Sequence, residues 1–586
     1  MSHRYRVRIV PERLEMEVQL FLDGATAGPL RVMTPTWVPG AYGFMKYGRD
    51  LFEVKAFDAK THSELTVVRD GWPAFVVEAR GAVEIRFKVV AADPAWGELV
   101  GFIGSEQALL LGTHLLFAPS LPGPCRVEYE LPKGWPMHHP SGAKRISEGV
   151  YEYPSYPALL DAPIAAGRFE RRTRELGGVP FHFVFFEKAL GYDEKIEAFL
   201  DALARIADRC HEVFGSFPFE DYTFFFTFNP LAKWGLEHAN STTIALDEDT
   251  FFDDDSWARG LRVAAHELFH AWNVCRLKPA PLGKPDFERG SFPDALWVSE
   301  GVTRYYEFLL LARAGVIGAP VFFSNVVNYW RQLSSQPAAS RVSLADASRA
   351  TFLNHNKYPG SVNTSIDYYD AGMLVAFDLD VALRGAAKAD SLDAAFGAFY
   401  RDFVGQGDGF THAQAAAFFE ARVPGLGARL DSKVLRPGTL SIVEALEKLG
   451  FEVVTGKSKV LGLVMAEKIP AEIANVLDDS PAGLCGLAPT DVIERVNEYP
   501  FKPKVLAWAT ANLAPVFLEV RRGSRRLAFD VEPAAREQIQ ELRWVGTEAQ
   551  AEAVRGWLGQ PDFKPAQGER ISLAAFENFH GIQKVV

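Results

Sequence analysis

Alternation of apolar and polar residues dominates the first third of the chain. From Tyr5 to about Gly167, apolar residues occupy every second position in short runs such as RYRVRIV, LEMEVQLFL and AVEIRFKVVA, and Gly and Pro separate the runs. Strands with one apolar face are typical of an antiparallel sheet that packs one side on a core. The pattern predicts an antiparallel β domain at residues 1–168.

The period changes from two to 3.6 between Asp193 and Phe214, which predicts a helix that Gly215 ends. Strands are expected at Tyr222 to Asn229 and at Ser241 to Leu246, with residues 233–239 as a loop between them. Helical patterns then dominate to about Arg422. These features predict a second, mostly helical domain at residues 169–436.

A stretch rich in Gly and Pro, VPGLGARLDSKVLRPG at residues 423–438, marks a plausible boundary. Short strands return beyond it, so a small domain is predicted at residues 437–535. Residues 536–586 are predicted to be a tail with one short helix, EAQAEAVRGWL, that Thr547 can cap. The chain is expected to be a multidomain α+β protein.

The charge balance limits the partners of the chain. Its 74 acidic and 62 basic side chains give a formal charge of −12, which repels phosphate backbones and anionic membranes. Its four Cys have no CxxC spacing, which suits a reducing compartment. The sequence shows no signal-peptide core and no apolar run of spanning length. We expect a cytoplasmic protein that contacts neither nucleic acid nor membrane.

The segment His266-Glu267-Leu268-Phe269-His270 carries the clearest chemistry. It lies in an apolar helical run that Asp255 or Ser256 can cap. Two His at positions i and i+4 share a helical face, so both imidazoles can reach one metal ion. Glu267 follows the first of them, where it can touch a metal-bound water without being a ligand.

A catalytic zinc site of this type needs a third ligand, commonly a carboxylate. The segment WVSEGVTRYYE at residues 297–307 reads as a helix that places Glu300 in an apolar setting. Glu300 is the predicted third ligand, although an ordinary amphipathic helix would turn it to solvent. Glu307 is the alternative, either as a ligand or as a group that orients an imidazole.

These motifs resemble those of a known family. HELFHAW followed by WVSEGVTRYYE is similar to the gluzincin aminopeptidases, which are related to aminopeptidase N. The WGLEH segment at residues 234–238 narrows the resemblance to the glycyl aminopeptidase family, whose members carry a C-terminal PDZ domain. The early segment TWVPGAYGFMKYGRDLFEV also resembles that family, so the likeness extends to about residue 535.

The resemblance implies a thermolysin-like catalytic domain with one zinc ion. His266, His270 and Glu300 would hold the ion, and Glu267 would activate its water. Gly235, Leu236 and Glu237 would form the segment that anchors the free amine of a peptide substrate, because a carboxylate there pairs with an ammonium group. Tyr369, or Tyr368 beside it, would stabilise the oxyanion.

The C-terminal block resembles a PDZ domain in its DSPA and DVIERVN segments, and Gly462 would lie in the loop that binds a peptide carboxylate. Thr490 stands where this pattern usually has Gly. The chain ends in Gln583-Lys584-Val585-Val586, an apolar end of a kind that such grooves accept. This tail would dock in its own groove or a neighbour's; otherwise it packs elsewhere or is mobile.

The resemblance favours a zinc aminopeptidase that removes small N-terminal residues such as Gly or Ala from peptides. Two alternatives remain open at this point. One is a zinc endopeptidase with the same metal site, which would not need Glu237. The other is a peptide-binding scaffold that uses its PDZ domain and keeps a vestigial metal site.

Overall fold

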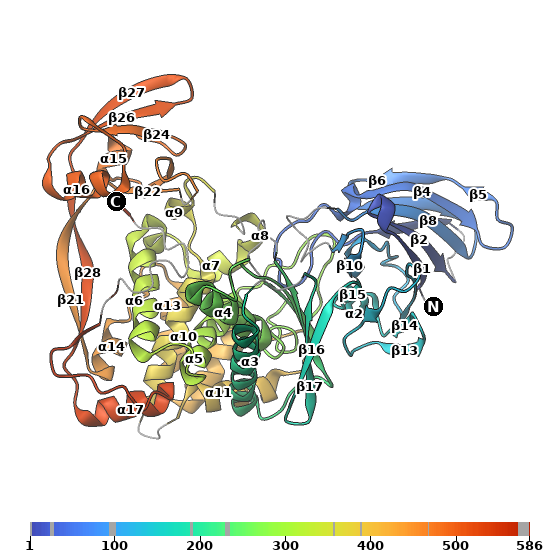
Figure 1. The fold of residues 1–586 in the computed structure, drawn as a ribbon, viewed down its shortest axis with the longest axis horizontal. Coiled ribbons are helices and arrows are strands. Elements are labelled where there is room, and N and C mark those ends of the chain that lie inside the picture. The colour runs from blue at the N-terminus through green and yellow to red at the C-terminus, as the bar shows by residue number, and fades with distance from the viewer. Residues whose placement is uncertain are drawn as a thin grey trace. The chain divides into compact units, whose positions relative to one another are not determined.

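The computed structural model describes residues 3–23, 28–92, 101–187, 191–228, 235–354, 358–386, 390–466, 468–571, 573 and 585–586. The chain divides into two compact units, Met1–Ser291 with Val404–Asp408 and Phe292–Phe403 with Gly409–Val586 (Figure 1). Among the described residues, no helix is both long enough and apolar enough to span a bilayer.

An eight-stranded sheet forms the N-terminal part of the first unit, as the alternation predicts. Every second side chain of β1 is buried, beginning with His3. In spatial order the strands are β13 (Lys144–Ser147), β14 (Val150–Tyr153), β11 (Cys125–Glu130), β1 (His3–Val10), β2 (Glu15–Leu22), β8 (Val83–Val90), β4 (Leu51–Asp58) and β5 (Glu64–Leu65). The expectation of a purely antiparallel sheet is wrong at one pair, because β1 and β11 run parallel. The chain between them builds other strands before β11 returns to the side of β1.

Two smaller sheets and several short helices complete this β-rich region. One sheet has the order β12 (Met137–His138), β15 (Ile164–Gly167), β10 (Gln107–Leu110) and β9 (Phe102–Ile103), and the other has β3 (Gly28–Met33), β7 (Ala74–Ala79) and β6 (Val67–Asp70). The helices are η1 (Pro11–Arg13), η2 (Tyr47–Arg49), η4 (Gly112–His114) and α2 (Tyr156–Leu160). A single apolar cluster connects the large sheet with these elements.

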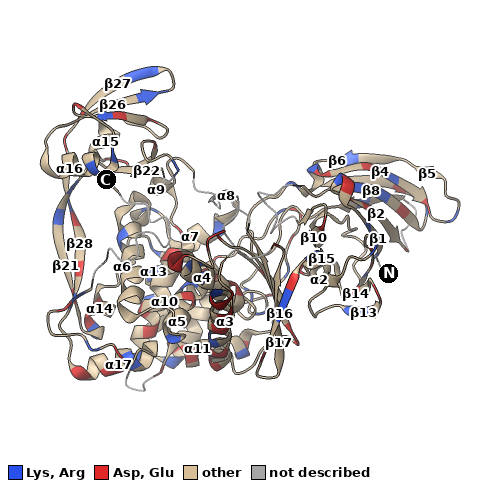
Figure 2. Cartoon of the chain, viewed as in Figure 1, with Lys and Arg blue, Asp and Glu red and all other residues tan. Residues whose placement is uncertain are grey.

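A five-stranded sheet and two helices form the rest of the first unit. The strand order is β16 (Glu170–Leu176), β17 (Val179–Phe185), β18 (Tyr222–Thr227), β20 (Ser241–Ala245) and β19 (Gly235–His238). Helix α3 (Asp193–Phe214) has the predicted bounds and ends at Gly215 in the left-handed conformation. Its polar face carries six acidic residues, part of the dispersed negative charge of the chain (Figure 2). Helix α4 (Asp254–His270) packs on α3 and on β19 and β20.

Helices build most of the second unit. They are η5 (Trp297–Val302), α5 (Thr303–Arg313), α6 (Ala319–Ser335), η6 (Pro337–Ser340), α7 (Leu344–Arg349), α8 (Thr351–Asn354), α9 (Ser361–Thr364), α10 (Tyr368–Arg384), α11 (Leu392–Phe403), α12 (His412–Arg422), α13 (Leu426–Leu435) and α14 (Val443–Leu449). Helix α10 is buried on nearly all sides and contacts η5, α5, α6 and α13, so it is the central helix of this unit. The stretch at residues 423–438, rich in Gly and Pro, contains α13.

Short strands return after α14, as predicted. These elements are β21 (Phe451–Val460), β22 (Leu463–Met465), β23 (Ile473–Val476), α15 (Pro481–Leu484), β24 (Val492–Val496), β25 (Tyr499–Pro500), α16 (Pro503–Asn512), β26 (Val516–Arg522) and β27 (Arg525–Val531). They are followed by β28 (Ala534–Trp544), α17 (Glu548–Leu558) and β29 (Arg570–Ile571). Helix α17 has the predicted bounds, and Thr547 caps it in a capping box with Gln550. Strand β28 pairs along the whole length of β21, so the chain after residue 535 is tied to the small domain.

Candidate active site

Helix α4 carries the His266–His270 segment in its last turn. The side chain of Asp253 caps the helix by accepting a hydrogen bond from the Ser256 N–H at 2.8 Å. The prediction of Asp255 or Ser256 as the cap is therefore wrong by two or three residues. His266, Glu267 and His270 are 8%, 6% and 2% exposed. Buried ionisable groups are costly unless a partner or a function compensates for their burial.

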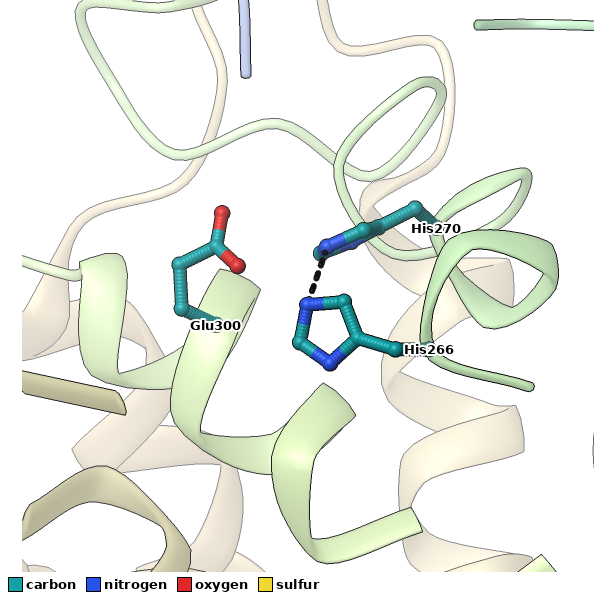
Figure 3. A group of neighbouring side chains, drawn as sticks. All are labelled: His266, His270 and Glu300. Carbon is teal, nitrogen blue, oxygen red and sulfur yellow. Dashed lines mark hydrogen bonds between the residues drawn. The ribbon is translucent and has the colours of Figure 1, made fainter. Parts of the chain in front are cut away.

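The two imidazoles of α4 converge on one point. Their Nε2 atoms lie 3.0 Å apart, and the rings are nearly perpendicular (Figure 3). Two nitrogens on one tetrahedral zinc ion would lie about 3.3 Å apart, given Zn–N distances of about 2.05 Å. The Nδ1 of His270 lies 2.7 Å from the carbonyl oxygen of Asn273 and donates to it. That hydrogen bond fixes the tautomer in which Nε2 of His270 is left as a lone-pair donor to a metal.

Glu300 lies on η5, a π-helical turn that runs directly into α5. The residue is 1% exposed, so Glu300 does not face solvent as it would on an ordinary amphipathic helix. His266, His270 and Glu300 each offer a ligand atom within 4.8 Å of the other two (Figure 3). Two imidazoles and one carboxylate are a donor set of catalytic zinc sites, so the residues present fit this metal. Glu307 is buried on α5 and belongs to neither of the metal-compatible groups found among the described residues.

Gly235, Leu236 and Glu237 lie on β19, at the edge of the five-stranded sheet. This segment is a strand paired with β20 and not the loop that the sequence pattern predicts, because the short run GLEH gives no periodicity of its own. Trp234 lies outside the described residues. Leu236 is buried in the apolar cluster, whereas Gly235 faces α4: a Cβ on Gly235 would lie 2.5 Å from Oε1 of Glu267.

Glu237 lies close to the end of α4. Glu237, Glu267 and His270 each have a ligand atom within 4.8 Å of the other two. A Cβ on Gly40 would lie 2.7 Å from the carboxylate carbon of Glu237, and Gly40 has a positive φ of 87°. Gly40 therefore leaves room for this carboxylate, which is 7% exposed. Gly40 belongs to the TWVPGAYGF segment, so the family resemblance of that segment is the signal in the sequence that could have indicated this site residue.

A cavity of about 310 Å³ opens beside Glu237. Its wall includes Val38, Leu236, His238, Cys275 and Asp161. Asp161 accepts hydrogen bonds from Nδ1 of His238 at 3.1 Å and from the Ala239 N–H at 3.0 Å. No sequence pattern indicates Asp161 as a site residue, because it is far from β19 along the chain.

The phenol of Tyr222 lies behind Glu267 and donates to its backbone carbonyl at 3.4 Å. Burial raises the pKa of Tyr222 well above its ordinary value, and the charges of Cys275, Glu267 and Glu237 raise it further. Tyr222 therefore remains protonated and supports the last turn of α4.

Tyr368 and Tyr369 begin α10, which Asp367 caps by accepting from the N–H of Tyr369 at 2.9 Å. The hydroxyl of Tyr368 is buried against Thr351 Oγ1 at 2.8 Å, and burial raises its pKa. Tyr369 is partly exposed, and Arg304 lies over its ring. Of the two phenols, Tyr369 is the one that is not enclosed.

Comparison with known proteins decides the family. Two family models match: the M61 peptidase N-terminal domain at residues 4–168 and the M61 glycyl aminopeptidase at residues 259–375. The chain belongs to the M61 glycyl aminopeptidase family. The match at residues 259–375 of this M61 chain includes His266, Glu267, His270, Glu300 and Tyr369, and the family places the protein among the peptidases.

A solved structure shares the fold of this chain. An aminopeptidase N family protein from Idiomarina loihiensis aligns with a TM-score of 0.82 at 20% identity, covering 95% of this chain and 100% of the other. An M1 zinc metallopeptidase from Deinococcus radiodurans has a TM-score of 0.45 at 16% identity, covering 74% and 93%. Yeast LTA4 hydrolase has a TM-score of 0.45 at 14% identity, covering 75% and 68%. Among curated proteins the M61 chain has no match.

Proposed function

We propose that this M61 peptidase is a zinc-dependent aminopeptidase that removes small residues, Gly or Ala, from the N-terminus of peptides. The proposal depends mainly on the closeness of Glu237 to Glu267 and His270. In a peptide, the N-terminal nitrogen and the first carbonyl carbon are separated by one Cα, about 2.5 Å across two bonds. A carboxylate that pairs with the ammonium group must therefore lie beside the group that attacks the first peptide bond.

Zinc held by His266, His270 and Glu300 would supply a Lewis acid and a water of lowered pKa. The carboxylate of Glu267 accepts a proton from the attacking water and passes it to the leaving amine. Glu237 binds the substrate ammonium and fixes the register at one residue from the end. The phenol of Tyr369 donates to the oxygen on which negative charge develops.

Gly235 has a steric role in this scheme. Because a Cβ there would meet the Glu267 carboxylate, only glycine lets β19 approach α4 closely enough for both Glu237 and Glu267 to serve one substrate. The preference for Gly or Ala is part of the proposal on the basis of the family resemblance.

We also propose that the small β domain is a PDZ domain that binds peptide ends. Two backbone features support this assignment. Gly462 has a φ of 89° in the loop expected to bind a carboxylate, and Thr490 adopts a φ of 71° at the position where the pattern usually has Gly. Such domains bind an extended peptide by adding a strand to a sheet edge.

The substitution Glu267→Gln tests the catalytic proposal. The variant should keep one zinc ion per chain by metal analysis and lose turnover of glycine and alanine amides by about a thousandfold, since it keeps the ligands and loses the base. Glu194→Gln, at an exposed position of α3, is the matched control and should keep full activity. Unchanged turnover by Glu267→Gln, or an absence of zinc in the native protein, would refute the proposal.

A further inference from the structure

The last two residues of the printed sequence lie in the small β domain. Three consecutive backbone N–H groups, those of residues 461–463, donate to one oxygen of Val586 at 2.9, 2.8 and 3.2 Å. The N–H of Val586 in turn donates to the carbonyl oxygen of Leu463 at 2.8 Å. Val585 forms an antiparallel bridge with Val464 of β22. Val585 and Val586 thus continue the sheet at β22 as a short added strand.

Apolar contacts accompany these hydrogen bonds. Val586 packs against the core cluster of the small domain, which includes Leu461, Leu463 and Leu487. Val585 packs on a separate small cluster of Val362, Val464 and Leu477. Each valine side chain therefore has its own apolar surface.

The loop of residues 461–463 is shaped for an anion. A carbonyl oxygen has two lone pairs, yet three N–H groups point at the same oxygen here. Successive backbone N–H groups that turn toward one point form a site for anions such as a carboxylate. The turn requires glycine at position 462, because its φ is 89° and a Cβ there would collide with the side chain of Ser480.

We propose that this loop and β22 bind peptides by a free C-terminal carboxylate and a small apolar last residue, and that Val585–Val586 is the built-in occupant of the site. The groove is then closed to other peptides until this tail leaves. The proposal rests on the peptide-binding role proposed above for the small domain, and it is independent of the aminopeptidase chemistry.

The occupied groove is joined to the helical part of the same unit. Val362, which contacts Val585, lies on α9, and the neighbouring Asn363 donates to the carbonyl of Val476 at 2.9 Å and accepts from the Asp478 N–H at 2.9 Å. Helix α9 ends at Thr364, shortly before α10 begins at Tyr368. The tail thus covers part of the contact between the small domain and the segment that leads into α10.

An occupant in the same chain competes strongly with a free peptide. A tethered ligand acts at an effective concentration of about millimolar, so a peptide of about 10 μM intrinsic affinity would bind the native chain roughly a hundredfold more weakly than an empty groove. Removal of Val585 and Val586 should therefore raise the affinity for the free peptide by about this factor. A chain that continues with Gly-Ser after Val586 should bind the peptide equally tightly, because position 586 then offers the loop a peptide carbonyl and no carboxylate.

The test uses a fluorescent peptide with the sequence of residues 578–586 and the full-length protein. Binding should be at least tenfold tighter to the two-residue deletion and to the extended chain than to the native chain, and the peptide amide should bind to none of them. Leu484→Ala, at an exposed position of the same domain, should bind the peptide as weakly as the native chain does.

Hydrogen exchange provides the second measurement. The N–H groups of residues 461–463 should be protected in the native chain, exposed in the deletion and protected again when the peptide is added. Equal binding to native and deleted chains would refute the built-in occupant alone. Absence of binding to all three chains would refute the groove as a whole, while turnover of amino-acid amides would still report separately on the catalytic site.

Discussion

Gly301 of η5 and Gly372 of α10 bring two helices into direct backbone contact. A Cβ on Gly372 would lie 2.7 Å from Cα of Gly301 and 2.9 Å from the carbonyl oxygen of Trp297. No flexible side chain can yield at this contact, because the neighbouring atoms are backbone. Glu300 precedes Gly301, so this backbone contact fixes the position of the candidate ligand Glu300 relative to α10. The π-helical turn that carries Glu300 is of a kind that is frequent at functional sites.

Gly372→Ala should therefore disturb both stability and metal binding. Forcing one methyl group into a closely packed contact costs about 1–3 kcal/mol in the free energy of unfolding. The accompanying shift of η5 should lower the zinc content after dialysis. Gly556→Ala on α17 is the matched control, since a Cβ there meets nothing within 4 Å and alanine favours a helix by up to about 1 kcal/mol. Thermal unfolding and metal analysis check both variants, and an undisturbed Gly372→Ala protein would contradict the steric argument.

The two adjacent tyrosines of α10 should differ in what their hydroxyl groups do. Tyr368→Phe removes the partner of the buried Thr351 hydroxyl and should cost about 1–2 kcal/mol of stability, with little change in kcat. Tyr369→Phe should lower kcat by about 10²- to 10³-fold and leave stability unchanged, as expected for an oxyanion donor. Steady-state kinetics beside denaturant unfolding separates the two effects. The opposite assignment, a catalytic loss in Tyr368→Phe alone, would make Tyr368 the donor.

Local patterns predicted the elements that depend on local sequence. Helix α3 has a long apolar stripe and a terminal Gly, and α17 has a capping box, so both have the predicted bounds. The predicted cap of α4 lies too far along the chain because Asp253, Asp254 and Asp255 are chemically alike and only the backbone shows which one precedes the first turn. Where a boundary depends on geometry and not on residue type, the sequence is ambiguous.

Contacts between distant segments could not be predicted in this way. The parallel pairing of β1 with β11 depends on where the intervening chain returns, which no periodicity encodes. Gly40 lies against Glu237, and Asp161 binds His238, although each pair is far apart in sequence. The pairing of His266 with His270 could be predicted because their spacing lies within one helix, whereas the surroundings of Glu237 come from three separate parts of the chain.

Two adjacent histidines should make the first unit sensitive to acid. Burial and the charges of His182, Arg171 and His139 lower the pKa of His138 to about 3, and burial lowers that of His139 to about 4. His138 lies between Arg171 and Thr223, and His139 accepts from Tyr153 through Nε2 at 2.6 Å. Both are therefore neutral in the folded protein at pH values at which an unfolded histidine, with a pKa of about 6.5, is charged.

The sign of the pH effect follows from proton binding. Below pH 6.5 the unfolded chain binds more protons than the folded chain, so the free energy of unfolding falls as the pH decreases toward 4. Each histidine should lower the free energy of unfolding by an amount on the order of 3 kcal/mol between about pH 6.5 and pH 4. His138→Gln or His139→Gln should flatten the dependence, and His211→Gln, at an exposed position of α3, should not. Denaturant unfolding at pH 7, 6, 5 and 4 measures the slopes, and equal slopes in all four proteins would contradict this account.

Glu237 should decide whether the protein requires a free N-terminus. Loss of a charge-assisted hydrogen bond to the substrate ammonium costs about 1.5–3 kcal/mol, so Glu237→Gln should lower kcat/KM for free peptides by about 10- to 100-fold, mainly through KM. N-terminally acetylated peptides should be poor substrates of both proteins, because the acetyl group removes the charge and would occupy the space beside Glu237. Zinc content should not change, since Glu237 lies outside the proposed ligand set. Efficient cleavage of acetylated peptides by the native protein, with no effect of Glu237→Gln, would instead support an endopeptidase that uses the same two histidines.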